Sequence, residues 1–361
     1  MSDEEEGFRS VASRLTGEKE ERLSLAARAL RYFHALCDDY FRAILPHDLV
    51  LLGAPSGLGK TQTALSIAMS NAAGGRRVHY FALEAERNEL ERRAKFSMLA
   101  LEARRRARDN AKDAEESGRS DRIRDATLKV QAAESMDYAD WLLGKCEDIC
   151  GPMNAAVDRK LGSSMSTMYT FYRGRDFTGA DLAKRVAEIH HDTDLIVVDH
   201  LHYVDAADTE DENRAVTDLI KMIRDIGLVI GKPFLLVAHL RKRNELAHRV
   251  VPTLDDFHGS SNLSKIVTQA IVLERAHEIE SPAWYLAPTF IAVRKDRRSG
   301  ATPLVALMYY NMITRVYDER YTLGRVTGKQ WKELGPLEVP RWAKHHVQLT
   351  TPTQDTRSGD R

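Results

Sequence analysis

One short segment of the chain combines glycines, a lysine and a hydroxyl residue. The segment from Leu51 to Thr61 reads LLGAPSGLGKT. Glycine lets the backbone turn closely around a phosphate, a lysine neutralises the outer phosphates, and a threonine hydroxyl can bind Mg²⁺. An apolar run precedes the segment and a helical pattern follows it, so helix amides would also face the anion. The segment therefore predicts a P-loop that binds ATP and Mg²⁺.

The P-loop pattern assigns the cofactor contacts to consecutive residues. Lys60 is expected at the β- and γ-phosphates, and Thr61 is expected to be a ligand of Mg²⁺. Ala54 departs mildly from the pattern G-x-x-x-x-G-K-[ST], because it stands at the first glycine, with Gly53 just before it. The predicted nucleotide-binding residues are Ser56, Gly57, Leu58, Gly59, Lys60, Thr61 and Gln62.

Two acidic residues are expected to complete this site. Asp199 ends a buried apolar run and would hold Mg²⁺ through water, opposite Thr61. A helix-capping role for Asp199 is the alternative. Glu84 ends the apolar run that comes next along the chain after the P-loop strand, and ligands bind at that edge of an open parallel sheet. We expect Glu84 to orient the attacking water, with Glu86 as a competing residue and a plain surface carboxylate as a third interpretation.

Short apolar runs alternate with helical patterns along most of the chain. Several runs are apolar throughout, which is typical of strands in a sheet that is covered on both faces. The alternation predicts an α/β fold with a mainly parallel, twisted sheet and helices on both faces. The expected strands cover residues 48–52, 78–83, 169–172, 195–199, 233–238, 270–273, 289–293 and 304–309.

Two helical regions are expected beside this alternation. Apolar residues recur every three or four positions over 18–44, which predicts an amphipathic helix that packs on its own domain or on a neighbouring subunit. The charge-dense stretches 85–117 and 121–150 favour a solvated helical hairpin, with a partner-binding arm as the alternative. The expected domains are an N-terminal tail and linker-type helix at 1–45, an ATPase domain at 46–318 with an insertion at about 85–150, and a C-terminal extension at 319–361 with a disordered tail.

The bulk composition limits the classes of function. Lys+Arg and Asp+Glu both count 53 in 361 residues, so any contact with nucleic acid must be local. The three cysteines, Cys37, Cys146 and Cys150, do not form a disulfide framework, and buried thiols are favoured over a metal site. No apolar run has membrane-spanning length and no signal peptide is evident, so we expect a cytoplasmic protein without a membrane partner.

The order of these motifs resembles the RecA-like ATPase domain of the DnaB-type replicative helicases over roughly residues 35–318. Residues 81–84 (FALE) are similar to the family's Phe-Ser-Leu-Glu, whose Glu activates water, and residues 199–201 (DHL) are similar to its Asp-Tyr-Leu. Residues 212–214 (ENR) match its Glu-Asn-Arg. The resemblance implies a RecA-like P-loop NTPase core. The family's N-terminal collar domain has no counterpart, so we expect a collarless form similar to small plasmid and phage helicases.

Three further segments receive roles from the resemblance alone. His239 stands where the family has the Gln that senses the γ-phosphate; a core histidine is the alternative. Lys295 and Arg297 match the Lys-x-Arg that reaches the nucleotide of the neighbouring subunit, with Arg298 as an alternative finger and a solvated hairpin as the plain interpretation. The loop at 241–249 matches a loop that faces the central channel, or is a solvated charged loop. Its predicted nucleic-acid contacts are Arg241, Lys242, Arg243 and Arg249.

Two classes of function stay open at this point. The resemblance implies a homo-oligomeric, hexameric ring ATPase that uses ATP and Mg²⁺ to translocate on single-stranded DNA and unwind it in the 5′–3′ direction. The zero net charge and the acidic loop at 205–212 favour a regulatory or assembly ATPase. Such an enzyme would recognise a protein partner through 85–150 or 319–346. A P-loop kinase is a weaker third hypothesis, because it needs neither the sensor strand nor the late basic motif.

Overall fold

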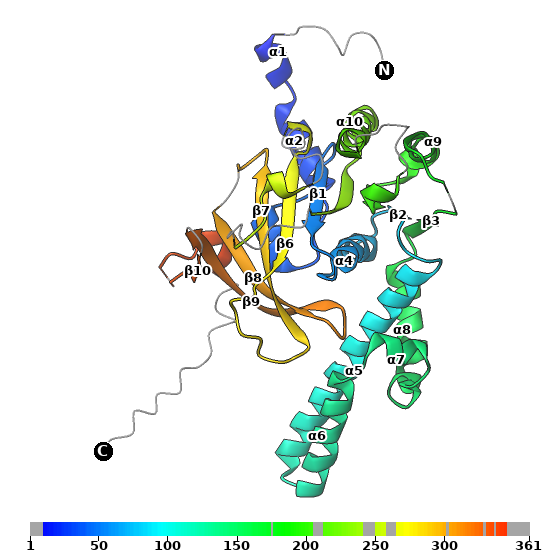
Figure 1. Cartoon of the computed structure of the whole chain (residues 1–361), viewed down its shortest axis with the longest axis vertical. Helices are drawn as coiled ribbons and strands as arrows, with labels where there is room; N and C mark the ends of the chain where they lie inside the picture. Colours follow the sequence, from blue (N-terminus) through cyan, green and yellow to red (C-terminus); the bar gives the residue numbers. More distant parts are fainter. Residues whose placement is uncertain are drawn as a thin grey trace.

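The computed structural model describes residues 10–174, 176–204, 212–240, 250–257, 265–300, 303–327, 330–335 and 337–344. Within these residues the chain forms one ten-stranded sheet (Figure 1). Its strands are β1 (Leu49–Ala54), β2 (Val78–Ala82), β3 (Met168–Tyr172), β4 (Leu195–Asp199), β5 (Phe234–His239), β6 (Gln269–Arg275), β7 (Leu286–Asp296), β8 (Leu304–Asn311), β9 (Val316–Thr327) and β10 (Gln330–Glu333).

The sheet joins a parallel half to an antiparallel half. The strand order is β10-β9-β8-β7-β6-β1-β5-β4-β2-β3. Every neighbouring pair from β6 to β3 is parallel, whereas the pairs from β6 to β10 are antiparallel. The strand β1 is central, between β5 and β6, so the segment that follows it lies at the middle of one sheet edge. The predicted mainly parallel sheet is confirmed.

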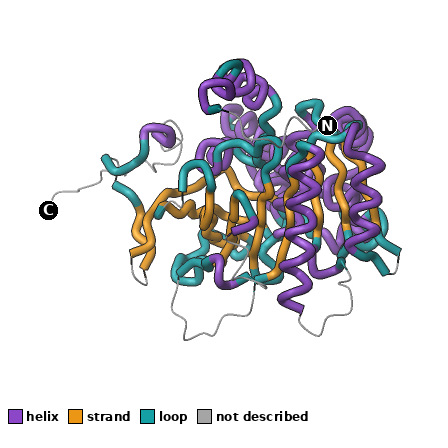
Figure 2. Tube along the Cα trace, turned by 90° about the horizontal axis from the view of Figure 1, so that it is seen from above, coloured by secondary structure: helices purple, strands orange, loops and turns teal. Residues whose placement is uncertain are grey.

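Helices lie beside the parallel strands (Figure 2). None of the helices in the described ranges has an apolar stretch long enough to cross a bilayer. The helices are α1 (Val11–Leu15), α2 (Glu18–Ala27), α3 (Ala35–Phe41), α4 (Lys60–Ala73), α5 (Glu89–Ser117), α6 (Ser120–Glu134), α7 (Tyr138–Leu142), α8 (Glu147–Ser164), α9 (Gly179–Ile189) and α10 (Glu212–Ile230).

The strand β1 shows why both faces of the sheet are covered. All six of its residues are buried, and successive side chains of a strand point to opposite faces. Val50 and Leu52 belong to a core with Leu65 of α4, whereas Leu51 belongs to a second core with Ile220 of α10. A strand between two such cores must be apolar throughout, which is the pattern seen in the sequence.

The N-terminal region differs from the predicted continuous helix over 18–44. It forms α2 and α3 separately, and Leu30 makes an antiparallel bridge to Ile44. The side chain of Asn71 fixes the break, because it accepts a hydrogen bond from Arg31 N (2.9 Å) and donates one to Arg31 O (2.8 Å). The helix α3 packs on its own domain, whereas α2 buries no residue. The apolar spacing therefore reflects burial at the bridge between Leu30 and Ile44 and in α3, but not in α2.

The helical insertion is longer and more divided than predicted. The helix α5 packs against α6 and α8, and the hairpin projects away from the sheet (Figure 1). The second predicted helix, 121–150, is interrupted after Glu134. Asp137 accepts hydrogen bonds from Ala139 N (2.8 Å) and Asp140 N (3.3 Å), so its carboxylate caps the new helix α7. The insertion, hereafter called the arm (residues 89–164), ends at Ser164.

The arm has a small hydrophobic core of its own. Phe96 of α5, Tyr138 of α7 and Cys150 of α8 contribute to it. Cys146 and Cys150 are both buried in this core, in agreement with their interpretation as buried thiols. Burial raises the pKa of the Cys150 thiol to about 11, so this group stays protonated at neutral pH.

The expected domain boundaries fall inside packed structure. Leu36 and Phe41, which precede residue 45, share a core with β1. Residue 318 lies within β9, which pairs with β8 and β10. Two tryptophans also join the C-terminal segment to the sheet domain. Trp331 packs on Phe290 (ring centroids 5.6 Å apart), and Trp342 stacks on Tyr40 (5.9 Å).

Candidate functional site

The P-loop connects the end of β1 to the start of α4. Gly57 and Gly59 have φ values of 83° and 74°, a left-handed conformation that side chains disfavour. Gly59 has a second constraint, because a Cβ atom there would lie 2.7 Å from the ring of Tyr310. Ala54 is instead the last residue of β1 and is fully buried. Alanine is therefore compatible with the position where the pattern expects glycine.

Lys60 is the first residue of α4, directly after the loop, and is almost completely buried. Its Nζ donates hydrogen bonds to the carbonyl oxygens of Ala54 (3.0 Å) and Pro55 (3.2 Å), and it lies 3.0 Å from His239 Nδ1. Burial lowers the pKa of the Lys60 ammonium to about 8, although Glu84 and Asp199 act in the opposite direction. A bound anion would favour the charged form of Lys60.

Asp199 ends β4, with its carboxyl group buried beside the P-loop. Tyr80 donates a hydrogen bond from its hydroxyl to Asp199 Oδ2 (2.7 Å), whereas Asp199 Oδ1 is buried without a hydrogen-bond partner in the described part of the chain. Burial raises the pKa of Asp199 to about 6, against the hydroxyls of Tyr80 and Thr61. A carboxylate with one unused oxygen, next to a threonine hydroxyl, fits Mg²⁺, which prefers oxygen ligands.

One cavity of about 780 Å³ joins these groups. Glu84 and Glu86, which follow β2, both line it, so the cavity leaves both as residues that could orient water. Leu58 packs in the core beneath the loop, so only its backbone can face a phosphate. The predicted residues that line the cavity are Ser56, Gly57, Gly59, Lys60, Thr61, Gln62, Glu84, Asp199 and His239.

The far wall of the cavity comes from segments that the sequence motifs did not indicate. Arg93 and Tyr138 of the arm line it, together with Tyr310 and Arg315 from β8 and the turn that follows. The guanidinium of Arg315 lies 4.1 Å from the centroid of the Tyr138 ring. The arm therefore contacts the sheet domain at the mouth of the site. These residues lie far from the P-loop in sequence, so no local pattern could have assigned them to it.

His239 ends β5, directly beside the P-loop strand. It pairs in register with Ala54, so its side chain reaches the loop at the level of Lys60. Two more histidines lie next to it. The rings of His200 and His239 have centroids 3.9 Å apart, and His202 Nδ1 lies 3.2 Å from His200 Nδ1. His200 directly follows Asp199, and that position was the available sequence signal for it.

Lys295 and Arg297 lie at the opposite edge of the sheet from the P-loop. The end of β7 pairs with the start of β6, and Arg297 N donates a hydrogen bond to Thr268 O (2.9 Å). Thr268 N in turn donates to Leu49 O (2.9 Å), at the start of β1. The length of β1, about 16 Å at 3.3 Å per residue, separates these side chains from the P-loop of the same chain.

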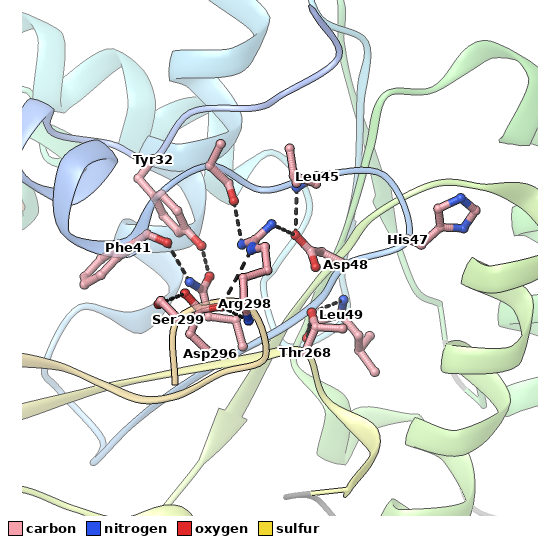
Figure 3. A network of polar contacts seen from close by, with 12 residues as sticks. Tyr32, Phe41, Leu45, His47, Asp48, Leu49, Thr268, Asp296, Arg298 and Ser299 are labelled. Carbon is pink, nitrogen blue, oxygen red and sulfur yellow. Dashed lines mark hydrogen bonds and ion pairs between the residues drawn. The ribbon is translucent and has the colours of Figure 1, made fainter. Parts of the chain in front are cut away.

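Arg298, the alternative finger, belongs to a structural network (Figure 3). It forms an ion pair with Asp48 (2.9 Å) and donates a hydrogen bond to Ala43 O (2.8 Å). Asp48 Oδ2 also accepts a hydrogen bond from Leu45 N (2.7 Å). The network ties the late basic hairpin to the chain that enters β1. Both arginines are exposed, but Arg298 is held by these contacts within its own subunit, whereas the Arg297 side chain donates a long hydrogen bond to Lys265 O (3.4 Å).

This network predicts different roles for the two neighbouring arginines. Arg298→Ala is expected to lower the free energy of unfolding by about 2 kcal/mol, because it leaves the mostly buried carboxylate of Asp48 without its ion-pair partner. Arg297→Ala serves as the control and is expected to change it by less than about 0.5 kcal/mol. Urea denaturation of both variants measures the difference. Equal free energies of unfolding for the two variants would show that the ion pair of Arg298 does not stabilise the fold.

Two predicted segments lie outside the described residues. They are residues 205–211 of the acidic loop predicted at 205–212, and the basic loop at 241–249 with the predicted nucleic-acid contacts Arg241, Lys242, Arg243 and Arg249.

Comparison with known proteins supports the fold. A family model described as "AAA domain" matches residues 19–245. No curated protein matches the chain in sequence. A solved structure titled "The Structure Of A DnaB-Like Replicative Helicase And Its Interactions With Primase" is similar, with a TM-score of 0.58, 14% identity, and coverage of 86% of this chain and 67% of that chain. A second solved structure, whose title describes an ATPase domain, is similar with a TM-score of 0.57, 14% identity, and coverage of 86% of this chain and 99% of that chain. The predicted fold class and the resemblance to DnaB-type ATPase domains are confirmed at the level of fold.

Proposed function

Because the chain belongs to the AAA-domain family, whose model matches residues 19–245, we propose that it is an ATP-hydrolysing ring motor. It would translocate on single-stranded DNA and unwind duplexes, as a DnaB-like 5′–3′ helicase does. Six copies would form the ring, with a nucleotide between each pair of neighbours. ATP and Mg²⁺ are its proposed cofactors, and the cytoplasm its proposed location.

The observation that carries this proposal is the cavity that joins the P-loop to three strand ends. Lys60 and the P-loop amides would bind the phosphates, and Thr61 and Asp199 would hold Mg²⁺. Mg²⁺ supplies charge neutralisation on the β- and γ-phosphates when it is bound. Glu84 would orient the attacking water, and His239 would contact the γ-phosphate from β5. These roles divide binding, proton acceptance and phosphate sensing among separate strands.

The positions of Lys295 and Arg297 support the ring. Both lie at the C-terminal end of β7, at the edge opposite the P-loop, so they can serve a nucleotide only on a neighbouring copy. A head-to-tail interface between identical subunits generates a closed ring when its rotation closes. The helix α2 buries none of its residues and would dock on the next subunit in such a ring.

A nucleic-acid substrate is proposed from the fold and from the basic loop at 241–249. By their titles, one of the similar structures is a DnaB-like replicative helicase studied with primase, and the other is an ATPase domain. In a ring, six copies of the loop would concentrate positive charge in a chain of zero net charge.

A second function is favoured by the surface of the arm. Four leucines of the arm remain exposed although it has its own core, and the arm also lines the nucleotide cavity. An ATPase that acts on a protein partner through this surface would couple the partner to the nucleotide state. The exposed leucines are Leu101 (47%), Leu128 (57%), Leu142 (48%) and Leu143 (70%).

The test is the steady-state ATPase rate of the full chain, measured with and without single-stranded DNA over a range of protein concentrations. A translocating ring is expected to show stimulation by DNA and a steep dependence on concentration, because its sites form between subunits. A rate that depends on protein concentration but is unchanged by single-stranded DNA, and by RNA in a parallel assay, would reject the translocase and favour the assembly ATPase. A rate per subunit that is independent of concentration would reject shared sites.

A further inference from the structure

Three side chains that could bind a metal ion lie next to the proposed Mg²⁺ ligands, Thr61 and Asp199, but do not include either of them. Glu84, His200 and His239 follow or end β2, β4 and β5, which bring them to one edge of the sheet. One ligand atom from each lies within 4.8 Å of those of the other two. Three ligands of one ion at about 2.1 Å are separated by about 3.4 Å in tetrahedral geometry, so small side-chain movements would close the group.

His200 is the member whose chemistry indicates a cation. It is completely buried, and its Nε2 atom has no hydrogen-bond partner among the described residues. Its Nδ1 lies 3.2 Å from His202 Nδ1, so one of these nitrogens donates and the other accepts. If His200 Nδ1 donates, then Nε2 keeps its lone pair. Metal-binding histidines are commonly oriented in this way, by a hydrogen bond from the second ring nitrogen.

The electrostatic surroundings keep this lone pair available. His200 is completely buried, and burial disfavours a charged imidazole, so the neutral ring with its lone pair is the favoured form. A buried neutral imidazole with an unused acceptor is destabilising unless something binds it. A cation with a water ligand would satisfy it.

We propose that Glu84, His200 and His239 form a second cation site, specific for borderline transition metals such as Zn²⁺ and Co²⁺. Two imidazoles and one carboxylate are the ligands of many zinc sites with an open position. Mg²⁺ prefers oxygen ligands and would be held by Thr61 and Asp199 instead. The two sites thus differ in ligand type and hence in metal.

Occupation of this second site would inhibit ATP hydrolysis, a consequence that rests on the function proposed above. The metal would bind Glu84, which would then no longer orient water, and His239, which would no longer contact the γ-phosphate. Lys60 Nζ lies 3.0 Å from His239 Nδ1, so its positive charge opposes the metal. Metal and Lys60 therefore compete for the same imidazole.

The binding test uses Co²⁺ as a probe with the full chain, free of nucleotide and Mg²⁺. Co²⁺ bound by imidazoles in a low-symmetry site gives visible d–d absorption, which is independent of ATPase activity. Titration is expected to show such bands at one equivalent, and Zn²⁺ is expected to abolish them. His200→Phe and Glu84→Gln are each expected to weaken Co²⁺ binding at least about tenfold.

The controls separate binding from folding. His191→Phe removes an exposed histidine outside the cavity and should leave the Co²⁺ titration unchanged. Glu84 is exposed, so Glu84→Gln should fold even if His200→Phe does not. Absence of d–d bands in the unmodified chain would overturn the proposal, and so would titrations of both variants that match the unmodified chain.

The inhibition test compares ATPase rates at saturating MgATP with and without Zn²⁺. Zn²⁺ is expected to inhibit the unmodified chain and His191→Phe, and chelation should restore their rates. The rate of His200→Phe is expected to be the same with Zn²⁺ as without it. Equal inhibition of His200→Phe and the unmodified chain would show that Zn²⁺ acts elsewhere and would overturn the inhibitory role. If the chain proves not to hydrolyse ATP, the proposed function fails, but the Co²⁺ titration still decides the metal site.

Discussion

Lys60→Ala is expected to lower the rate of ATP hydrolysis at least about 100-fold, the loss typical of removing one preorganised donor from a transition-state site. Lys60 is the buried cation between the P-loop and His239, and among the described residues it is the only lysine that lines the cavity. Its ammonium would neutralise charge on the β- and γ-phosphates in both the bound and transition states. The variant should therefore lose affinity for MgATP as well as turnover.

The measurement is a steady-state ATPase assay together with calorimetric titration of MgATP. Lys129→Ala is the matched control, because Lys129 lies on the exposed face of the arm in an ion pair with Asp125 (2.7 Å). This control should keep the rate of the unmodified chain. A Lys60→Ala protein that hydrolyses ATP normally would show that the P-loop is not the catalytic site. Circular dichroism would confirm that the variant is folded.

Arg297→Ala is expected to lower the hydrolysis rate about 10³-fold while MgATP still binds, because an arginine donated in trans stabilises charge on the transferring phosphoryl group. Arg297 is exposed at the sheet edge opposite the P-loop of its own chain. Its removal should therefore leave each P-loop intact. A calorimetric titration of MgATP and an ATPase assay on the same sample separate the two effects.

Mixing the two inactive variants gives a sharper test of action in trans. A mixed ring places some intact P-loops, from Arg297→Ala subunits, next to intact arginines from Lys60→Ala subunits. Partial recovery of the ATPase rate is expected on mixing, although neither variant is active alone. Normal hydrolysis by Arg297→Ala would show that the finger assignment is wrong. A mixture that assembles but stays inactive would argue against Arg297 acting in trans.

Local sequence patterns carried most of the information about the P-loop. The glycines at 57 and 59, the lysine and the threonine act through backbone conformation and short-range geometry, so they are recognisable without the rest of the chain. The strands of the parallel half were also predictable, because burial on both faces makes each one an apolar run. The capping box of Thr178 and Asp181 at the start of α9 is likewise formed by residues close together in the sequence.

The boundaries of helices that depend on long-range packing were predicted less accurately. The apolar spacing over 18–44 suggested one helix, but a bridge to Ile44 and the side chain of Asn71 divide it. Asn71 lies outside this window, and helical spacing gives no sign that Leu30 and Ile44 pair with each other. The arm is divided at Asp137 for a local reason that the charge-dense composition concealed.

The sequence by itself determined the identity of the phosphate-binding residues and the α/β class of the fold. Both follow from backbone preferences and burial periodicity over a few residues. Only the tertiary structure decided which distant side chains meet: Tyr80 with Asp199, Arg315 with Tyr138, and His200 with His239. It also placed Arg298, and not the equally exposed Arg297, in an ion pair with Asp48. These contacts depend on strand order. Hydrogen bonding of β5 to both β1 and β4, for example, brings together residues that lie far apart along the chain.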